Sequence, residues 1–508
     1  MDQKALKTQI FTNDIIFNES AELPVDVDFM LPDYCPDIVK ILKCRAKPML
    51  SSKSVSGGTV TVDGNVTITV IYCDSDNRIC AHEHQFPFNK VFETGCDCDG
   101  AILNCRTKCE YINCRAVTGR KIDIHGAAGI YVRLIKRRCN DIIADFDDPV
   151  VELHRGSVPA TTPMGTVEKY LTVEEEIEIG QGQPTVRSLI RYEADACIRE
   201  SKLLNEKNIV RGELSVSLLY CSNQGAPQQV RAQIPFSQLL EMPGVTEQCR
   251  CDTKAEIACI EVKPRTAATG ETRNFILNAK LLISTTACCD NDVDVVLDAY
   301  SRKFEANLKR SDVGFQKISR TIDESCQCKA SLDFAEGALS EVADMWCDIQ
   351  SVNARMDEGE LCVSGTLLAN IIVYDQKGIP SYYEKPVEFS YKFPIEEKGN
   401  ITCEPQIDVR SSNYTITGSK TMDLRIELGV RAAIYLTQEM SLVTDLAVDE
   451  RQPLNHKDNG AMTIYFAEAG ESVWDIARNY RAAVEEIKAI NDVGEYLTED
   501  KMIMVPMN

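Results

Sequence analysis

Apolar and polar residues alternate along much of the chain, and three of these runs end in an apolar residue followed by Tyr. The runs span residues 64–72, 212–220 and 365–374. Alternation with a period of two is typical of a strand that has one face in a core, so each run predicts a β-strand. A Gly precedes the Tyr by eight residues in the first two runs and by nine in the third. The extra residue would turn the third strand over unless a β-bulge absorbs it.

The surroundings of the three runs repeat as well. A polar turn follows each Tyr, and a second strand then reaches Phe88, Phe236 and Phe389 at near-equal offsets. A long alternating run closes each copy, over residues 122–134, 275–283 and 424–434. The pattern predicts a mainly β protein in which one antiparallel module, a β-sandwich or a small barrel, is repeated three times.

Changes in composition divide the chain into four predicted domains. Polar stretches between them, rich in Pro and Thr or in charged residues, are predicted as linkers. These linkers are residues 157–163, 301–336 and 449–460. The predicted domains are residues 1–150 (with an N-terminal segment), 165–300, 337–448 and a small tail at 461–508.

The tail has a different periodicity from the repeats. Strands are predicted at residues 463–467 and 501–506, and helices at 470–480 and 482–490, which gives the order βααβ. In the first helix the apolar residues recur at the spacing of one helical face. Ser472 is predicted to cap this helix, with Asp475 completing a shortened capping box.

The net charge of the chain argues against several classes of partner. The net charge is −22, from 77 acidic and 55 basic residues, and such a field repels phosphate backbones and anionic lipid. We therefore expect neither nucleic acid nor membrane insertion. The N-terminus lacks the apolar core of a signal peptide, so a cytosolic location is expected. The 22 cysteines are then expected to be mostly reduced, with no more than a few disulfides.

Candidate chemistry is sparse. Cys80, His82 and His84 would share one face of a strand and are the best candidates for a metal site. The other two copies lack matching residues there, so an exposed strand face is the preferred interpretation. Phosphate-binding loops and nucleophile elbows are absent from the sequence. We therefore predict no catalytic residue, no metal and no cofactor, and we do not expect an enzyme.

The tail resembles a LysM domain. The residues that carry the resemblance are Tyr465, Gly470, Glu471, Ser472, Trp474, Ile476, Ala477, Tyr480, Ile487, Asn491, Leu497, Val505 and Pro506. LysM domains usually carry Pro-Gly in the loop before their last strand, where this chain has Glu499 and Asp500. Because that loop helps to form the glycan groove in sugar-binding members, the departure argues against glycan binding.

The repeats resemble the SPOCS domain of clostridial sporulation proteins. The opening signature of that domain is matched by the segment from Leu31 to Ile38 (LPDYCPDI), followed by Lys40, Ile41 and Leu42. Three such modules with a terminal LysM domain resemble the layout of the SipL-like spore coat morphogenetic proteins. The resemblance implies a non-enzymatic scaffold in the mother-cell cytoplasm, recruited to the forespore surface and the spore coat. It also implies two classes of partner, the SpoIVA-like coat-basement ATPase and other coat proteins.

The resemblance further implies that the tail contacts the ATPase. The predicted partner-binding residues are Gly470, Glu471, Ser472, Trp474, Leu497, Thr498, Glu499, Asp500 and Lys501. Trp474 lies off the apolar stripe of its helix, so we expect it to be partly exposed and to act as an anchor whose loss abolishes recruitment. The alternative is a peptidoglycan-binding protein whose LysM domain anchors the β-modules to cortex or cell wall.

Overall fold

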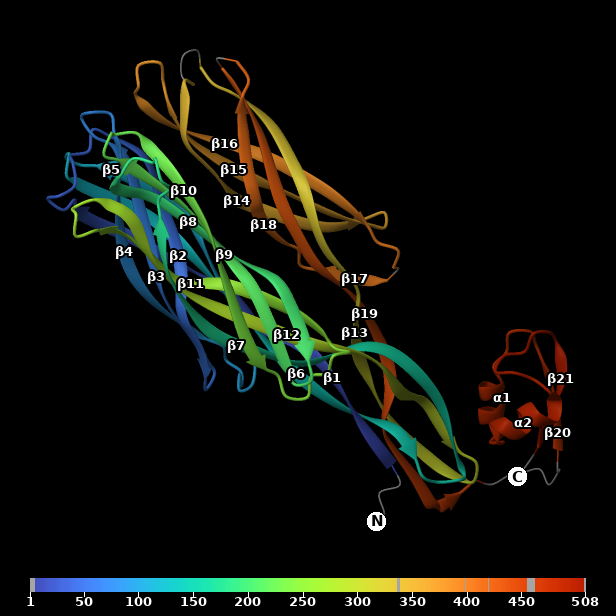
Figure 1. Ribbon diagram of the computed structural model, residues 1–508. Helices are drawn as coiled ribbons and strands as arrows, with labels where there is room; N and C mark the ends of the chain where they lie inside the picture. The colour runs from blue at the N-terminus through green and yellow to red at the C-terminus, as the bar shows by residue number, and fades with distance from the viewer. Residues whose placement is uncertain (1–4, 336–338, 398, 419, 455–461, 507–508) are drawn as a thin grey trace.

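The computed structural model describes residues 5–335, 339–397, 399–418, 420–454 and 462–506. Nearly all of this chain is antiparallel β-sheet, and the two helices found in it lie near the C-terminus. Three modules follow one another in sequence and pack into one elongated body, with the tail beyond its end (Figure 1). The prediction of a repeated, mainly β protein with a small α+β tail is confirmed.

Each module contains two sheets of the same topology. In module 1 one sheet has the order β1 (Ala5–Met30), β6 (Lys121–Phe146), β5 (Ile102–Ala116), and the other β2 (Lys40–Ser56), β3 (Thr59–Cys73), β4 (Ile79–Glu93). In module 2 the equivalents are β7 (Val151–Glu178), β12 (Thr272–Ser301), β11 (Arg250–Thr266), and β8 (Val186–Leu204), β9 (Lys207–Ser222), β10 (Pro227–Glu241).

The topology of module 3 differs from that of the other two modules only in the third strand of its first sheet. Its first sheet pairs β13 (Phe304–Asp333) with β19 (Thr421–Pro453), and two short strands, β17 (Asn400–Cys403) and β18 (Gln406–Ile416), lie on the other side of β19. Its second sheet is β14 (Glu341–Asp357), β15 (Glu360–Tyr374), β16 (Pro380–Pro394). One connection therefore interrupts the third strand without changing the order of the sheet.

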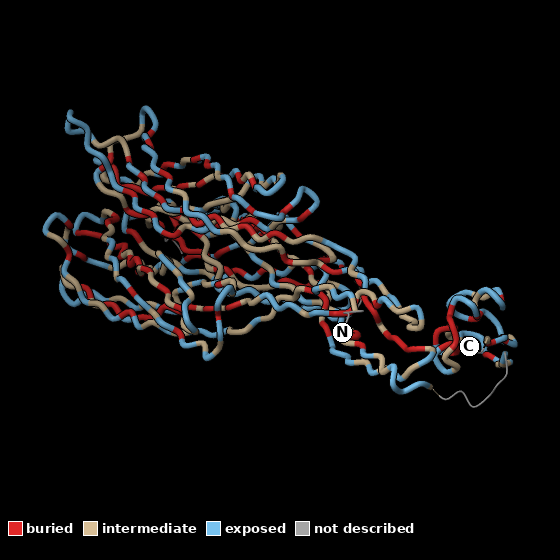
Figure 2. The backbone as a smooth tube through the Cα atoms, turned by 90° about the horizontal axis from the view of Figure 1, so that it is seen from below, coloured by how far each residue is buried: buried red, intermediate tan, exposed pale blue. Residues whose placement is uncertain are grey.

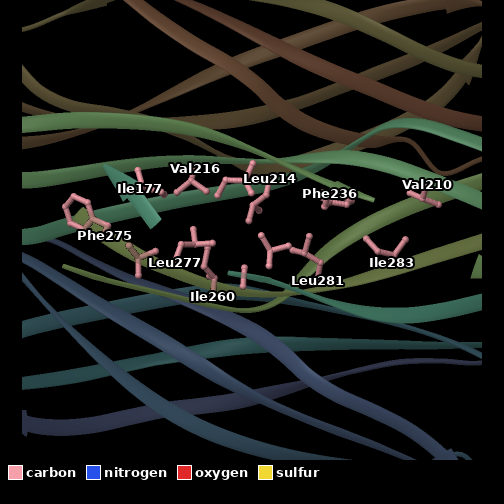
Figure 3. Close-up of a cluster of buried hydrophobic side chains, with 14 of the residues drawn as sticks. Ile177, Val210, Leu214, Val216, Phe236, Ile260, Phe275, Leu277, Leu281 and Ile283 are labelled. Carbon is pink, nitrogen blue, oxygen red and sulfur yellow. The ribbon is translucent and has the colours of Figure 1, made fainter. Parts of the chain in front are cut away.

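The two sheets of a module face each other across an apolar core. Figure 3 shows this core in module 2, where Phe275, Leu277 and Leu281 of β12 meet Leu214 and Val216 of β9. The two sheets of each module are separate, so the sandwich alternative is correct and the barrel alternative is wrong. Removing these alternating side chains from water provides the main stabilisation of each module.

The repeated Gly lies beneath a repeated Phe. Gly64 is opposite Phe88 and Gly365 is opposite Phe389 in the strand registers. A Cβ at Gly64 would lie 2.5 Å from Phe88 Cζ, and one at Gly365 would lie 2.6 Å from Phe389 Cζ. The glycine therefore leaves room for the aromatic ring to cross the neighbouring strand.

No β-bulge absorbs the apparent extra residue of the third copy, so Tyr374 lies on the other face of its strand. The pairing of β15 with β16 is regular, and the residue in the place of Tyr72 and Tyr220 is Val373. The Tyr72 hydroxyl donates to the Pro36 carbonyl, 3.1 Å away, a bond that Val373 cannot make. Tyr374 occupies the next position along the strand and packs between modules instead. The third run therefore has no inserted residue. It looks one residue longer because Val373 stands where the other copies have Tyr, and a Tyr happens to follow it.

The predicted linkers at 301–336 and 157–163 are also wrong. Residues 304–333 form β13, and 157–163 lie within β7, so modules 2 and 3 begin at the first residues of those strands. Both segments keep buried apolar residues in alternation, among them Val158, Val313 and Phe315. Because β7 lies at the edge of its sheet, it can accommodate Pro159 and Pro163. In the third predicted linker, β19 extends to Pro453, and residues 455–461 lie outside the described residues.

The long strands leave the sandwiches and form a stalk. In each pair the register shifts by one residue at the same place, beside Leu134, Ala287 and Ile434. A bulge bends the strand that carries it. Beyond this point the ribbons β1–β6, β7–β12 and β13–β19 converge, and Figure 2 shows buried residues along the inside of the stalk.

The stalk has pseudo-threefold symmetry. Equivalent residues of the three modules, Ile142, Val295 and Leu442, share one buried cluster, and the next residue of each strand enters a second cluster. Ion pairs join the modules in a ring. Asp145 pairs with Arg155 at 2.6 Å, Asp298 with Arg310, and Asp445 with Lys7 at 4.0 Å. The three cations occupy equivalent positions in their strands. Lys7 lies opposite Ile143, Arg155 opposite Val296 and Arg310 opposite Val443.

The sandwich bodies meet around the same pseudo-axis through their second sheets. Leu42, Ile190 and Trp346 belong to one buried cluster shared by the three modules. Beside this cluster Arg191 makes two bonds to Asp344, with Nε–Oδ2 at 2.7 Å and Nη2–Oδ1 at 3.0 Å. The two side chains are 6% and 1% exposed, so modules 2 and 3 are joined by a buried, bidentate ion pair.

Module 1 joins the same charge network through Arg45. The guanidinium bonds Glu193 of module 2 and lies 2.9 Å from Asp348 Oδ1 of module 3. Burial alone would raise the pKa of Glu193, but Arg45 and Arg191 beside it lower the pKa to about 2. Glu193 is therefore ionised across the physiological range.

Cysteine is used sparingly for cross-links. Cys249 and Cys289 form a disulfide, and the other twenty cysteines are free, in agreement with the expectation of few disulfides. Most of the free thiols are buried or partly buried. Burial raises the pKa of Cys80 to about 12 and that of Cys105 to about 11, so these thiols are protonated at neutral pH.

We expect Gly365→Ala to lower the stability of module 3 by about 2 kcal/mol, because the new methyl group would overlap the Ser351 carbonyl oxygen and also the Phe389 ring. Gly314→Ala is the matched control in the same module, since a Cβ there meets no atom within 4 Å. Chemical denaturation monitored by circular dichroism measures both. Equal midpoints for the two variants would contradict this account.

We expect Asp344→Ala to cost about 3 kcal/mol or more, because it leaves the buried Arg191 guanidinium without its main partner. Asp323→Ala removes an exposed carboxylate that pairs with Arg410 at 2.9 Å, and it should cost less than about 1 kcal/mol. The difference between the two unfolding free energies tests the buried network. A small, equal loss would show that the network is not important for stability.

Candidate functional site

The tail folds as predicted, in the order βααβ. It contains β20 (Met462–Ala467), α1 (Val473–Tyr480), α2 (Val484–Asn491) and β21 (Lys501–Pro506), and the two strands pair antiparallel. Ser472 stands at the N-cap position of α1, but its side chain makes no capping hydrogen bond. The predicted capping box is therefore wrong. The segment before the helix is held by backbone bonds instead, such as that from Val473 N–H to the Glu495 carbonyl at 3.0 Å.

The structure brings the two predicted binding stretches together. Gly470 N–H donates to the Leu497 carbonyl at 2.7 Å, and Leu497 N–H donates to the Glu471 carbonyl at 3.0 Å. Ala469 N–H donates to Asp500 Oδ1 at 2.8 Å. Residues 470–472 and 497–501, which we call the loop pair, thus form one continuous surface beside the start of α1.

The side chains of the loop pair divide into structural and exposed groups. Leu497 is buried in the tail core. The Tyr465 hydroxyl donates to Glu471 at 2.7 Å, so this carboxylate holds β20 to the loop. Thr498 and Glu499 are exposed. Only part of the predicted set is therefore available to a partner, and its binding role stays a prediction.

Trp474 is the residue that the structure places differently. Its side chain is buried, with 8% exposure, against the end of the stalk rather than partly exposed as predicted. The indole stacks on His154 with ring centres 4.8 Å apart and tilts against Tyr300 at 5.0 Å. Its Nε1–H donates to Asp298 Oδ2 at 3.2 Å. Trp474 therefore docks the tail on module 2 of the same chain.

Further bonds surround this contact, which we call the tail dock. The Tyr300 hydroxyl donates to the Ala482 carbonyl at 2.7 Å, and Arg478 pairs with Asp298 at 2.9 Å. Burial raises the pKa of Tyr300, so the hydroxyl keeps its proton for this bond at all physiological pH values. The stalk and the helices of the tail are thus joined by both apolar and charged contacts.

The tail dock uses one of three equivalent places on the stalk. Tyr300 follows Asp298 by two residues, and the corresponding residues of modules 1 and 3 are Asp147 and Ala447. Neither can supply an aromatic wall for Trp474. The sequence carried a signal here that was missed: an aromatic residue at the end of one repeat without a counterpart in the other two.

The candidate metal residues lie on β4 but are packed against an aromatic ring. Phe29 stacks on His84 with ring centres 4.8 Å apart and also contacts His82 at 5.5 Å. Cys80 is buried in the core of module 1. Among the described residues, no group of three or more His, Cys, Asp or Glu side chains is arranged to hold a metal ion. Within the same residues, no helix has the length and apolarity needed to cross a membrane.

Tryptophan fluorescence can test the tail dock, because the chain has only two Trp residues. In a Trp346→Phe background Trp474 becomes the sole reporter. We expect Tyr300→Ala to shift its emission to longer wavelength, since the indole loses a wall of its pocket and meets water. Tyr34→Ala, at a residue that is 83% exposed, is the control and should leave the emission unchanged. Identical spectra for both variants would rule out the dock in solution.

Comparison with known proteins bears on the modules. Residues 37–117 and 185–264 each match the family model described as SipL, SPOCS domain. These segments run from the start of β2 to β5 and from β8 to β11, so the matched unit is the inner part of modules 1 and 2 without the long strands. No curated protein and no solved structure gives a significant match. Modules 1 and 2 therefore each contain a SPOCS domain, and over these two segments the chain is similar to SipL.

Proposed function

We propose that this chain is a non-enzymatic scaffold of spore coat assembly, which its tail recruits to a SpoIVA-like coat-basement ATPase at the forespore surface. The SPOCS matches in modules 1 and 2 support a role in sporulation. The tail resembles a LysM domain in sequence, and its βααβ order agrees with that resemblance. Other coat proteins are the proposed partners of the three modules.

The observation that carries the proposal is the placement of the tail. It sits at the end of a stalk built from all three modules, held on one side by the tail dock, with its strands on the side away from the stalk (Figure 1). The modules themselves share buried clusters and a buried charge network. Such an assembly presents a small domain at a fixed distance from a rigid body, which suits recruitment.

The buried ionisable groups support a structural role for the body. Arg191 of module 2 pairs with Asp344 of module 3 and with Glu193 of its own strand. Asp298 is engaged with Arg310, Arg478 and Trp474. These groups hold elements together, and we propose that the chain has no catalytic activity.

The peptidoglycan alternative has less support. The loop that carries Glu499 and Asp500 is fastened through the Asp500 carboxylate to the backbone of Ala469. Two acidic side chains therefore border the place where a neutral glycan would lie in sugar-binding LysM domains. Retention on isolated peptidoglycan separates this alternative from the leading proposal.

Deletion from Ala461 onward should abolish co-purification with the SpoIVA-like ATPase and should disperse a fluorescent fusion from the forespore surface. The physical reason is that the tail carries the proposed contact, whereas the cores of the three modules lie outside it. Circular dichroism of the deleted chain is the folding control. Undiminished partner binding would move the contact into the modules, and binding of the full chain to peptidoglycan instead would favour the alternative.

A further inference from the structure

One face of the tail sheet is apolar and open to water. The side chains of β20 and β21 that point away from the helices form a contiguous group, and the register places Ile464 beside Met504 and Phe466 beside Met502. We call this group the outer sheet face. Its members, between 38% and 78% exposed, are Met462, Ile464, Phe466, Met502 and Met504.

The opposite face of the same sheet already supplies the core of the tail. Ala467, Ile503 and Val505 are buried against α1 and α2. A sheet with one face in a core normally places polar residues on the other face. The tail strands are instead apolar on both faces, and a contiguous exposed apolar group on a small domain indicates an interaction surface.

The outer sheet face is the accessible side of the docked tail. The helix side is occupied by His154, Asp298 and Tyr300 of the stalk. The sheet lies on the far side of the helices from this contact (Figure 1). A partner can therefore reach the outer sheet face without releasing the tail from the body.

Charge beside the face indicates the chemistry of its occupant. Glu468, Glu499 and Asp500 are exposed at the end of the sheet that carries Phe466 and Met502. The nearby Lys501 is bonded to the Asn491 carbonyl at 2.7 Å. Residues 461–508 contain nine Asp and Glu against four Lys and Arg. A second copy of this chain would bring the same acidic rim and another net charge of −22, so a basic occupant fits better.

We propose that the outer sheet face binds a protein segment whose apolar side chains are flanked by Lys or Arg. This inference rests on the proposed function, because it specifies the surface through which the tail meets its partner. The three methionines suit such a surface, since their flexible side chains adapt to the shape of the apolar segment. The acidic rim adds attraction that salt weakens.

The test uses the full chain and the purified SpoIVA-like ATPase of the same cell as the probe. The double variant Ile464→Gln and Phe466→Gln should lose at least tenfold in affinity, because both side chains are exposed and leave the tail core intact. Tyr34→Gln with Val39→Gln is the matched control, with residues 83% and 64% exposed on module 1, and should stay within twofold of the parent. Glu499→Lys should weaken binding and reduce its salt dependence.

Each outcome decides between the two proposals. Unchanged affinity of the outer-face variant, while the tail-deleted chain no longer binds, would overturn the outer sheet face and leave the proposed function standing. Retained binding by the tail-deleted chain, or no binding by the full chain, would overturn both. A dimer in sedimentation velocity that the outer-face variant converts to monomer would show that the occupant is a second copy, and this proposal would then be wrong.

Discussion

The packing of three modules around one pseudo-axis is the constraint on which the rest of the molecule depends. Each sandwich satisfies its own core, but one face of its second sheet and the ends of its long strands carry apolar residues that only the other modules cover. Covering these surfaces removes apolar area from water, which stabilises the assembled state. The stalk exists because three ribbons meet, since a two-stranded ribbon alone is only marginally stable in water.

Equivalent positions of the three modules carry different charges, and these differences distinguish the modules from one another at their interfaces. Lys43, Arg191 and Asp344 occupy equivalent positions, opposite Ile71, Leu219 and Ile372 in their registers. Three identical modules would place three like charges near the axis, whereas this chain places Arg191 against Asp344. A buried ion pair adds little net stability compared with an apolar core, but a buried charge left without its partner strongly lowers stability. The network therefore specifies which module faces which.

Because the three modules differ, the tail dock forms on module 2 alone and fixes the orientation of the tail. Only module 2 ends in an aromatic residue that can receive Trp474, and Asp298 there serves both the ring of stalk ion pairs and the indole. The tail is thereby fixed with its helices inward and its sheet outward (Figure 1). An apolar sheet face that would be a liability on a free domain becomes a surface of defined orientation on a rigid support.

The sequence by itself determined the local structure, because the periodicity of apolar residues reports which side of a strand or helix is buried. It predicted the repeated module and the βααβ tail. It failed where burial comes from another part of the chain. Residues 301–336 look like a linker because the charged side chains of β13 hide its buried alternation, and Trp474 looks exposed because its partners, His154 and Tyr300, are more than 170 residues away. Only the tertiary structure decides such contacts, since they depend on how three similar modules pack and not on the pattern within any one of them.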